Sequence, residues 1–299
     1  MSGTNSYKSI VKLTRPQNVI FGSLTAPVGA YIAYTGTWDL TIVQILFAQT
    51  LAVGSFIIFG NVLNDIIDLE NDKINHPLRP LPSGRVSLNY ARNIVILSSI
   101  ASMIFVAYGT YALTSLKGGS WVPVSLIWVF AFFLMLTYEI GPKTKNIALL
   151  GNTSISLMVG LVIIYGAASV GSIDNTLIWY VGSVAFFVNL AREIVKDVED
   201  MDGDTGRRTL PMLISKRKSR IFSWFLCLIS IILLAIPYYA EILPLPTIIF
   251  QIPSMLIILR LNITLNNGDD TKSQKNMKLG MYFGLLGFIM SVSSKGFFI

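Results

Sequence analysis

The sequence has little of what soluble enzymes commonly use for catalysis and metal binding. Its 299 residues include one cysteine, Cys227, and one histidine, His76. A lone cysteine excludes an intramolecular disulfide, and a lone histidine excludes a site built from several histidines. Charged residues are also scarce, at 13% against about 25% in typical soluble domains. The N-terminal residues are polar and basic and lack the apolar stretch of a signal peptide, so none is expected.

Long apolar runs take the place of the missing polar residues, and hydrophobic residues make up 53% of the chain. About 20 apolar residues are enough to cross a bilayer as a helix. The sequence therefore predicts an all-α membrane protein with nine transmembrane helices, forming one domain over residues 1–299. The nine runs cover about 17–36, 41–66, 90–114, 121–138, 147–170, 176–196, 219–238, 245–266 and 277–298.

Basic residues are distributed unevenly between the two sides that nine spans would define. Of the 23 lysines and arginines, 21 fall on the side of the N-terminus, and only Lys117 and Lys295 fall on the other. Loops rich in lysine and arginine stay in the cytoplasm. We therefore expect a multi-pass protein of the cell membrane with a cytoplasmic N-terminus and an external C-terminus.

Ten of the sixteen acidic residues fall in two short segments, each directly after an apolar run. Residues 64–72 read NDIIDLEND, and residues 192–204 read REIVKDVEDMDGD. Both segments emerge on the side expected to be cytoplasmic, so an active site is expected to face the cytoplasm. A four-residue spacing, which puts side chains on one face of a helix, occurs in both segments. The residues with this spacing are Asn64, Asp68 and Asp72 in the first segment and Asp200 and Asp204 in the second.

Carboxylates at this spacing repel one another, and the edge of a membrane makes their ionised form more costly. A divalent cation would relieve both penalties. Oxygen ligands without cysteine or several histidines favour magnesium, manganese or calcium over zinc. Magnesium in particular binds one or two carboxylates and takes further oxygens from a substrate's phosphates.

Two other interpretations fit an acidic segment. The first is a solvated loop without function, because charge runs are usually solvated surfaces. Two such segments after corresponding helices make this interpretation weaker. The second is a membrane ion carrier, since acids inside membranes also mark ion pathways. The acids here lie at the ends of the apolar runs rather than in their middles.

A similar string of residues follows each acidic segment, RPLP at residues 79–82 and RTLP at residues 208–211. Arginine binds phosphate oxygens through paired hydrogen bonds, so an anionic substrate group is expected beside the carboxylates. The repetition also predicts two related four-helix halves plus one helix. Sites in membrane proteins with internal repeats often form where the halves meet.

At these residues the chain resembles the UbiA superfamily of intramembrane prenyltransferases, over about residues 14–215. The family's first motif, N-D-x-x-D-x-x-x-D, stands at residues 64–72, and its second, D-x-x-x-D, at residues 200–204. A K-D-x-x-D sequence leads into the second motif from Lys196.

Two further pieces of the family pattern are present. The string R-P-x-N stands at residues 15–18, and Tyr138 followed by Lys143 resembles a tyrosine and a lysine that precede the fifth helix. Glu139 stands where relatives often have a serine.

The resemblance implies nine helices around a central cavity, in which two magnesium ions hold a prenyl diphosphate. Diphosphate leaves, and an acceptor attacks the allylic cation. The implied catalytic residues are Asp68, Asp72, Asp200 and Asp204. The implied metal ligands are Asn64, Asp68, Asp72, Asp200 and Asp204, and the implied diphosphate contacts are Arg79, Tyr138, Lys143, Lys196 and Arg208.

Within the family, the two acidic runs look most like those of archaeal digeranylgeranylglyceryl phosphate synthases. Those enzymes add a second geranylgeranyl group to geranylgeranylglyceryl phosphate during archaeal lipid synthesis. The implied partners are a prenyl diphosphate and a lipid-like acceptor, without nucleic acid or an obligate protein partner. Prenylation of 4-hydroxybenzoate or a quinone precursor is the alternative reaction. The single contiguous D-G and A-R block of the CDP-alcohol phosphotransferases is not found.

Overall fold

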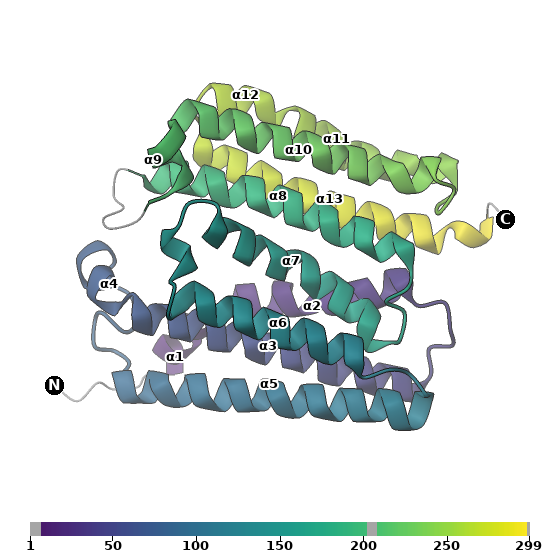
Figure 1. The fold of residues 1–299 in the computed structure, drawn as a ribbon, viewed down its shortest axis with the longest axis horizontal. Coiled ribbons are helices and arrows are strands. Elements are labelled where there is room, and N and C mark those ends of the chain that lie inside the picture. The colour runs from purple at the N-terminus through teal and green to yellow at the C-terminus, as the bar shows by residue number, and fades with distance from the viewer. Residues whose placement is uncertain (1–6, 202–207, 298–299) are drawn as a thin grey trace.

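The computed structural model describes residues 7–201 and 208–297, and this part of the chain is helical (Figure 1). Within these ranges the one extended pairing is an isolated parallel bridge between Ile147 and Arg208. The helices are α1 (Tyr7–Thr14), α2 (Pro16–Ala33), α3 (Leu40–Ile67), α4 (Leu69–Asn75), α5 (Leu88–Lys117), α6 (Val122–Glu139), α7 (Leu150–Ser169), α8 (Thr176–Asp200), α9 (Leu210–Ile214), α10 (Lys216–Tyr239), α11 (Ile252–Leu259), α12 (Leu261–Asn266) and α13 (Asp270–Ser293). Short 3₁₀ turns cover Thr144–Asn146, Leu245–Gln251 and Lys295–Phe297.

Seven segments in the described residues are long and apolar enough to cross a membrane. They are α3, α5, α6, α7, α8, α10 and the combined stretch Leu245–Asn266, which contains α11 and α12. The expected all-helical membrane protein is thereby confirmed, and seven of the nine expected spans meet this standard. The other two runs correspond to α2 and α13, which begin with the polar sequences PQN and DTKSQKNMK. These polar residues keep both helices below the standard of length and composition that the seven segments meet.

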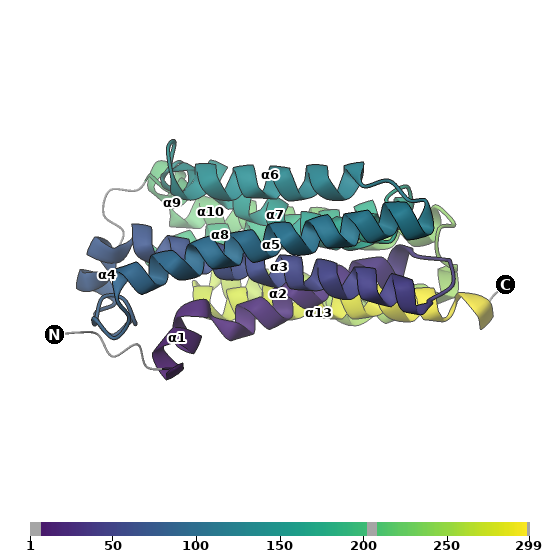
Figure 2. The same cartoon turned by 90° about the horizontal axis from the view of Figure 1, so that it is seen from below.

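The long helices run side by side along the longest axis of the molecule (Figures 1 and 2). Helix α7 packs against both α2 and α8, and so connects the helices around α3 with those around α8. Helix α1 and the end of α13 lie at opposite ends of the bundle (Figure 1). The ends of α3, α6 and α8 meet at the end that holds α1 and α4. Both acidic segments therefore emerge at the same end.

Helix α8 lies at the centre of the largest apolar core. Its buried residues, including Val188, Ile194 and Val198, pack against α7, α10 and α13. It is the most buried of the seven candidate spans, and α6 is the least. The second acidic segment therefore begins on a helix that is held from several sides.

The opposite end of the bundle is closed by helix caps. The Asp39 carboxylate accepts a hydrogen bond from the Ile42 amide at the start of α3, and Asn175 accepts one from the Leu177 amide at the start of α8. These caps satisfy amides that the first turn of a helix leaves without partners. Lys117 pairs with Asp39, and this hydrogen bond lowers the pKa of Asp39 below its usual value.

Helices α2 and α7 cross at two glycines, Gly29 and Gly166. A Cβ atom added at Gly166 would overlap the carbonyl oxygen of Ala26, and one added at Gly29 would overlap that of Ile163. In both cases the obstacle is backbone, which cannot move aside as a side chain can. Small residues allow such close contact between membrane helices, where packing rather than water exclusion drives association.

We expect Gly166→Ala to lower the melting temperature of the purified protein, because α2 and α7 must separate. Overpacking of this kind costs about 1–3 kcal/mol. Gly54→Ala is the matched control, because a Cβ there lies 3.6 Å from Val19 Cγ1, an ordinary contact. Equal melting temperatures for the two variants would contradict the close crossing.

Candidate active site

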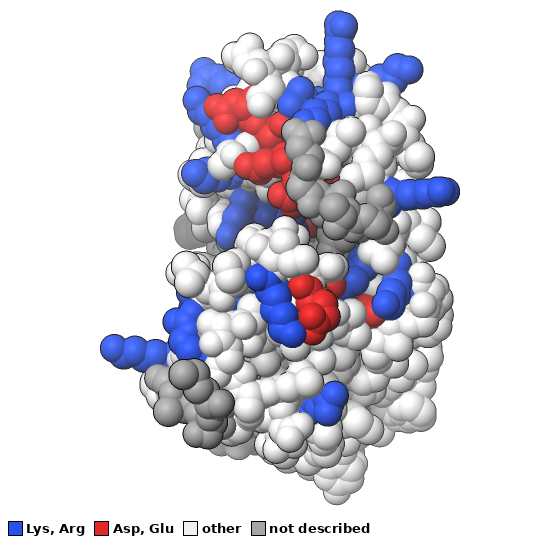
Figure 3. Space-filling view, turned by 90° about the vertical axis from the view of Figure 1, so that its left-hand side faces the viewer, with Lys and Arg blue, Asp and Glu red and all other residues white. Residues whose placement is uncertain are grey.

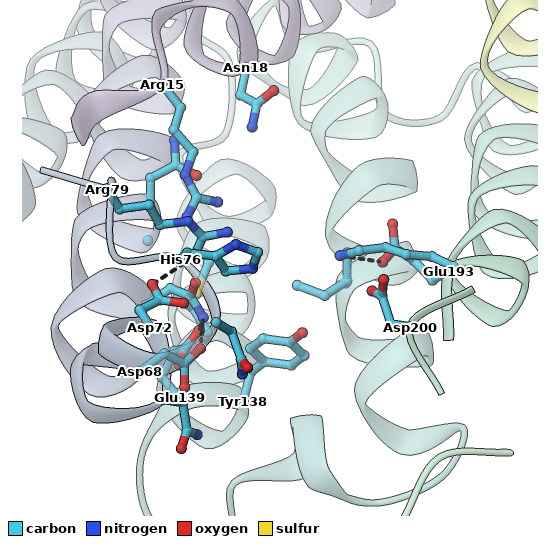
Figure 4. A pocket seen from close by; sticks show the side chains of 18 of the residues that line it. Arg15, Asn18, Asp68, Asp72, His76, Arg79, Tyr138, Glu139, Glu193 and Asp200 are labelled. Carbon is cyan, nitrogen blue, oxygen red and sulfur yellow. Dashed lines mark hydrogen bonds and ion pairs between the residues drawn. The ribbon is translucent and has the colours of Figure 1, made fainter. Parts of the chain in front are cut away.

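A cavity of about 710 Å³ opens at the end of the bundle where the acidic segments emerge. One wall comes from α3, α4 and α6, with the turn between α1 and α2 beside it, and the other comes from α8. Seen from this end, acidic side chains form two groups on the surface, and basic side chains lie beside both groups (Figure 3). The close-up shows Asp68 and Asp72 on one side of the cavity and Glu193 and Asp200 on the other (Figure 4).

The first wall contains a closed ring of four hydrogen-bonded side chains. Lys145 Nζ donates to Asp68 Oδ1 and to Glu139 Oε2, each at 2.7 Å. Asn64 Nδ2 donates to the other oxygens of the same two carboxylates, at 3.0 Å to Asp68 Oδ2 and 2.7 Å to Glu139 Oε1. The Glu139 side chain is only 1% exposed and that of Lys145 only 4%. Such burial is favourable only when the charges are paired and hydrogen-bonded.

The turn after α6 explains why Lys145, and not Lys143, joins this ring. Gly141 and Lys143 both adopt left-handed backbone conformations, with φ of 66° and 49°. The chain therefore reverses directly after Glu139 and brings Lys145 back beside it. Gly151 makes room for this return, because a Cβ there would lie 2.7 Å from Lys145 Cα. Lys143 itself is exposed and is not among the described residues that line the cavity.

Two arginines pair with two further carboxylates of the first segment, Asp72 and Asp65. Arg79 Nη1 lies 2.6 Å from Asp72 Oδ2, and both residues line the cavity. Arg15, in the turn between α1 and α2, pairs with the buried Asp65 of α3. The helix breaks at Asp68, between α3 and α4, yet Asn64, Asp68 and Asp72 all line the same cavity as their spacing predicts.

The second wall is the last part of α8. Arg192, Glu193, Lys196, Glu199 and Asp200 line the cavity from this helix. Arg192 Nη1 lies 2.6 Å from Glu193 Oε1, whereas Lys196 Nζ is 3.9 Å from Glu193 Oε2.

The remaining predicted residues lie at the edges of this arrangement. Tyr138 lines the cavity from α6. Arg208 is exposed, and its backbone amide donates to the Asn146 carbonyl at 3.1 Å, which ties its segment to the loop of Lys145. Asp204, the last residue of the second motif, lies outside the described residues.

The cavity offers oxygen atoms for a hard cation, but the described acids are not gathered into one cluster. No group of three or more His, Cys, Asp or Glu side chains in residues 7–201 and 208–297 is close enough to hold a metal ion. Asp68 and Asp72 instead accept hydrogen bonds from Lys145 and Arg79. The amide and carboxylate oxygens on the two walls face one space, which fits a cation such as magnesium bound between them with phosphate oxygens as further ligands.

Sequence reasoning missed Glu139 and Lys145 as members of the site. The available signal was weak, since each is a single charged residue near the end of the apolar run at 121–138. Their importance depends on a reversal of the chain that brings both against Asp68, and spacing alone does not predict that reversal.

A comparison with family models agrees with this arrangement, because residues 22–286 match the model described as the UbiA prenyltransferase family. The chain belongs to the UbiA prenyltransferase family. The resemblance to this family is thereby confirmed, and the protein is an enzyme that transfers prenyl groups.

Among the curated UbiA-type relatives is the digeranylgeranylglyceryl phosphate synthase of Pyrococcus horikoshii. It is 32% identical over 292 residues, which cover 96% of this chain and 98% of the relative. The synthase of Methanobrevibacter smithii is also 32% identical, over 93% of this chain and 95% of its own.

Solved UbiA structures have the same fold. A structure described as digeranylgeranylglyceryl phosphate synthase in membranes has a TM-score of 0.74 and 28% identity, and covers 95% of this chain and 98% of its own. A UbiA homologue from Archaeoglobus fulgidus, bound to DMAPP and Mg²⁺, has a TM-score of 0.67 and 19% identity, covering 94% and 99% of the two chains.

The ring of four side chains leads to a prediction about the two lysines. Lys145→Met should lower the melting temperature strongly, because Asp68 and Glu139 lose their shared ammonium group. Removing one partner of a buried ion pair costs about 3–5 kcal/mol. Lys143→Met, in the same turn but exposed, should melt like the wild type, and an equal loss in both variants would contradict the ring.

Proposed function

We propose that this enzyme transfers a geranylgeranyl group from geranylgeranyl diphosphate to geranylgeranylglyceryl phosphate, which forms the second ether bond of an archaeal membrane lipid. The observation that carries the proposal is the cavity in which Asn64, Asp68 and Asp72 face Asp200. It occurs in a chain that is similar over nearly its whole length to synthases named for this product.

The two aspartate motifs are proposed to hold Mg²⁺ through Asn64, Asp68, Asp72, Asp200 and Asp204. The A. fulgidus homologue bound to DMAPP and Mg²⁺ supports a divalent ion in this fold. When bound, Mg²⁺ would neutralise the charge that grows on the departing diphosphate. The aspartates that hold it, Asp68, Asp72, Asp200 and Asp204, are the proposed catalytic residues.

The cations around the cavity are proposed to bind the diphosphate. Arg79 and Lys196 line the cavity, and Tyr138 adds a hydroxyl group from α6. Lys145, like Lys143, is not among the described residues that line the cavity, but the Lys145 ammonium group lies 2.7 Å from Asp68, a proposed metal ligand. Lys143 and Arg208 are exposed in loops beside the cavity, where they can attract the anionic substrate.

Below the carboxylates, an aromatic column between α3 and α6 is proposed to receive the prenyl chain. The rings of Phe59 and Phe132 stack at 5.0 Å between centroids, and those of Trp128 and Phe132 at 5.2 Å. Gly60 and Met135, next to this column, line the cavity. When the C–O bond to diphosphate breaks, the allylic cation lies nearest these ring faces, which favour positive charge. The acceptor hydroxyl oxygen then forms the new C–O bond and releases its proton.

The proposal also covers topology. We take α2 and α13 as two further spans, which gives nine spans in two related four-helix halves plus one helix. The position of α1 and the end of α13 at opposite ends of the bundle supports an odd number of spans (Figure 1). Basic side chains at the end of the bundle that holds the cavity (Figure 3) support a cytoplasmic active site and N-terminus and an external C-terminus. The family match over residues 22–286 supports one domain for the whole chain.

An acceptor panel tests the proposed reaction. With labelled geranylgeranyl diphosphate and Mg²⁺, geranylgeranylglyceryl phosphate should yield the diether phosphate, detected by mass. 4-Hydroxybenzoate should yield nothing. Product from 4-hydroxybenzoate alone would replace the lipid reaction with aromatic prenylation.

Substitution of the carboxylates tests the metal assignment. Asp68→Asn and Asp200→Asn should each lower turnover about 100-fold or more, because the stabilisation of the departing diphosphate is lost. Glu70→Gln is the matched control in the first segment, because the Glu70 side chain is 80% exposed and pairs with Lys73. It should keep wild-type turnover at a similar melting temperature.

Two outcomes would contradict these assignments. Wild-type turnover in both aspartate variants would show that Asp68 and Asp200 are not metal ligands. Ion flux in proteoliposomes that survives both substitutions, without prenyl transfer by the wild type, would favour an ion carrier.

A further inference from the structure

The structure assigns a positioning role to Glu199 and to the first turn of α13. We propose that α13 holds Asp200 at its place in the cavity through Glu199, and so sets the affinity of the second carboxylate segment for Mg²⁺ and diphosphate. This inference rests on the proposed function, in which Asp200 is a metal ligand.

Glu199 lines the cavity, yet both oxygens of its carboxylate are occupied by α13. Oε1 accepts a hydrogen bond from the Thr271 hydroxyl, and Oε2 accepts one at 2.5 Å from Gln274 Nε2. Thr271 and Gln274 are one helical turn apart, so they present two donors on one face of α13. With both oxygens engaged outside the cavity, Glu199 acts as a link between two helices.

The first turn of α13 is itself fixed to a third helix. Arg220 of α10 forms two parallel hydrogen bonds to Asp270, at 2.8 Å and 2.6 Å. Such paired contacts between arginine and a carboxylate fix direction as well as distance. Asp269 caps the helix by accepting from the Lys272 amide at 3.1 Å. The donors that hold Glu199 are therefore attached to a rigid support and not to a free helix end.

The position of Asp200 makes this support important. Asp200 is the last residue of α8 and follows Glu199 directly. The end of a helix is where the backbone loses its regular hydrogen bonds and frays. A side chain that is tied to α13 one residue before Asp200 restrains the carbonyl, the backbone direction and hence the carboxylate of Asp200.

The first acidic segment provides an internal contrast. Glu70 follows Asp68 by two residues, as Glu199 follows Asp197. Glu70 pairs with Lys73 on its own short helix, at 2.7 Å, and connects no two long helices. Asp68 is instead held by Lys145 and Asn64. The two segments therefore use different supports. In the first segment Asn64 reaches Glu139 of α6, whereas in the second Asp197 accepts a hydrogen bond from Asn152 of α7 and Glu199 reaches α13.

The test removes the support from the α13 side, where no cavity residue is changed. Thr271→Val and Gln274→Leu, alone and together, should raise the Mg²⁺ concentration that gives half-maximal prenyl transfer. We expect an increase of about tenfold in the double variant, because metal affinity falls when the groups that orient metal ligands are lost. The thermal stabilisation of the full-length protein by Mg²⁺ plus pyrophosphate should shrink in the same order. Glu70→Gln is the control and should change neither quantity.

An exchange of the two partners distinguishes positioning from direct contact. Glu199→Gln combined with Gln274→Glu recreates a hydrogen bond between the same two side chains with donor and acceptor reversed. It should restore at least part of the Mg²⁺ affinity that Glu199→Gln or Gln274→Glu loses alone. If Glu199 binds the metal or substrate itself, the exchange fails to restore affinity and the α13 variants behave like the wild type, which overturns the proposal.

Two further outcomes complete the test. If the α13 variants have lower melting temperatures but an unchanged Mg²⁺ dependence, Glu199 contributes only to stability. That result would also overturn the proposal. Asp200→Asn serves as the reference for the proposed function. If Asp200→Asn abolishes prenyl transfer while the α13 variants behave like the wild type, the positioning role of Glu199 is wrong and the proposed function stands. If Asp200→Asn itself behaves like the wild type, both the positioning role and the assignment of Asp200 as a metal ligand are wrong.

Discussion

The rest of the site depends on how the protein buries carboxylates at the end of an apolar bundle. Glu139 and Asp68 share the ammonium group of Lys145, and Asn64 closes the ring from the opposite side. An unpaired charge at this place would be too costly, because both solvent and mobile counterions are limited there. The same hydrogen bonds hold the Asp68 carboxylate where it lines the cavity, so one arrangement both pairs the buried charges and prepares the site.

The two walls of the cavity are built on supports of different kinds. The acidic residues on the wall of α3, α4 and α6 are held by ion pairs from neighbouring loops, with Arg79 on Asp72 and Lys145 on Asp68. The wall of α8 stands on the apolar core, since α8 packs against α7, α10 and α13. Its charged end gains further support where Glu199 meets α13.

The helical membrane fold and the face of the first acidic segment followed from sequence, because apolar run length and helical spacing are local properties. Asn64, Asp68 and Asp72 line one cavity even though the helix breaks at Asp68. The sequence did not predict that Lys145 rather than Lys143 contacts Asp68. This contact depends on left-handed backbone conformations at Gly141 and Lys143 and on the space beside Gly151. The link from Glu199 to Thr271 and Gln274 joins residues far apart in the chain, and nothing in the local pattern indicates it. The apolar runs of α2 and α13 were expected as spans. The polar residues at their starts leave both helices less apolar than the standard that the other seven segments meet.

The close crossing of α2 and α7 also has a consequence for how the chain is made. Helix α2 leaves the ribosome early, but the groove that accepts its Gly29 is formed by α7, which is synthesised only after α3, α5 and α6. Because chains emerge N-terminus first, α2 remains without α7, its close-packed partner, until α7 has been made. During that interval α3 is the earlier neighbour against which it can rest. The order of insertion and the order of final packing are therefore different, and α7 completes the N-terminal part of the bundle only after most of it has entered the bilayer.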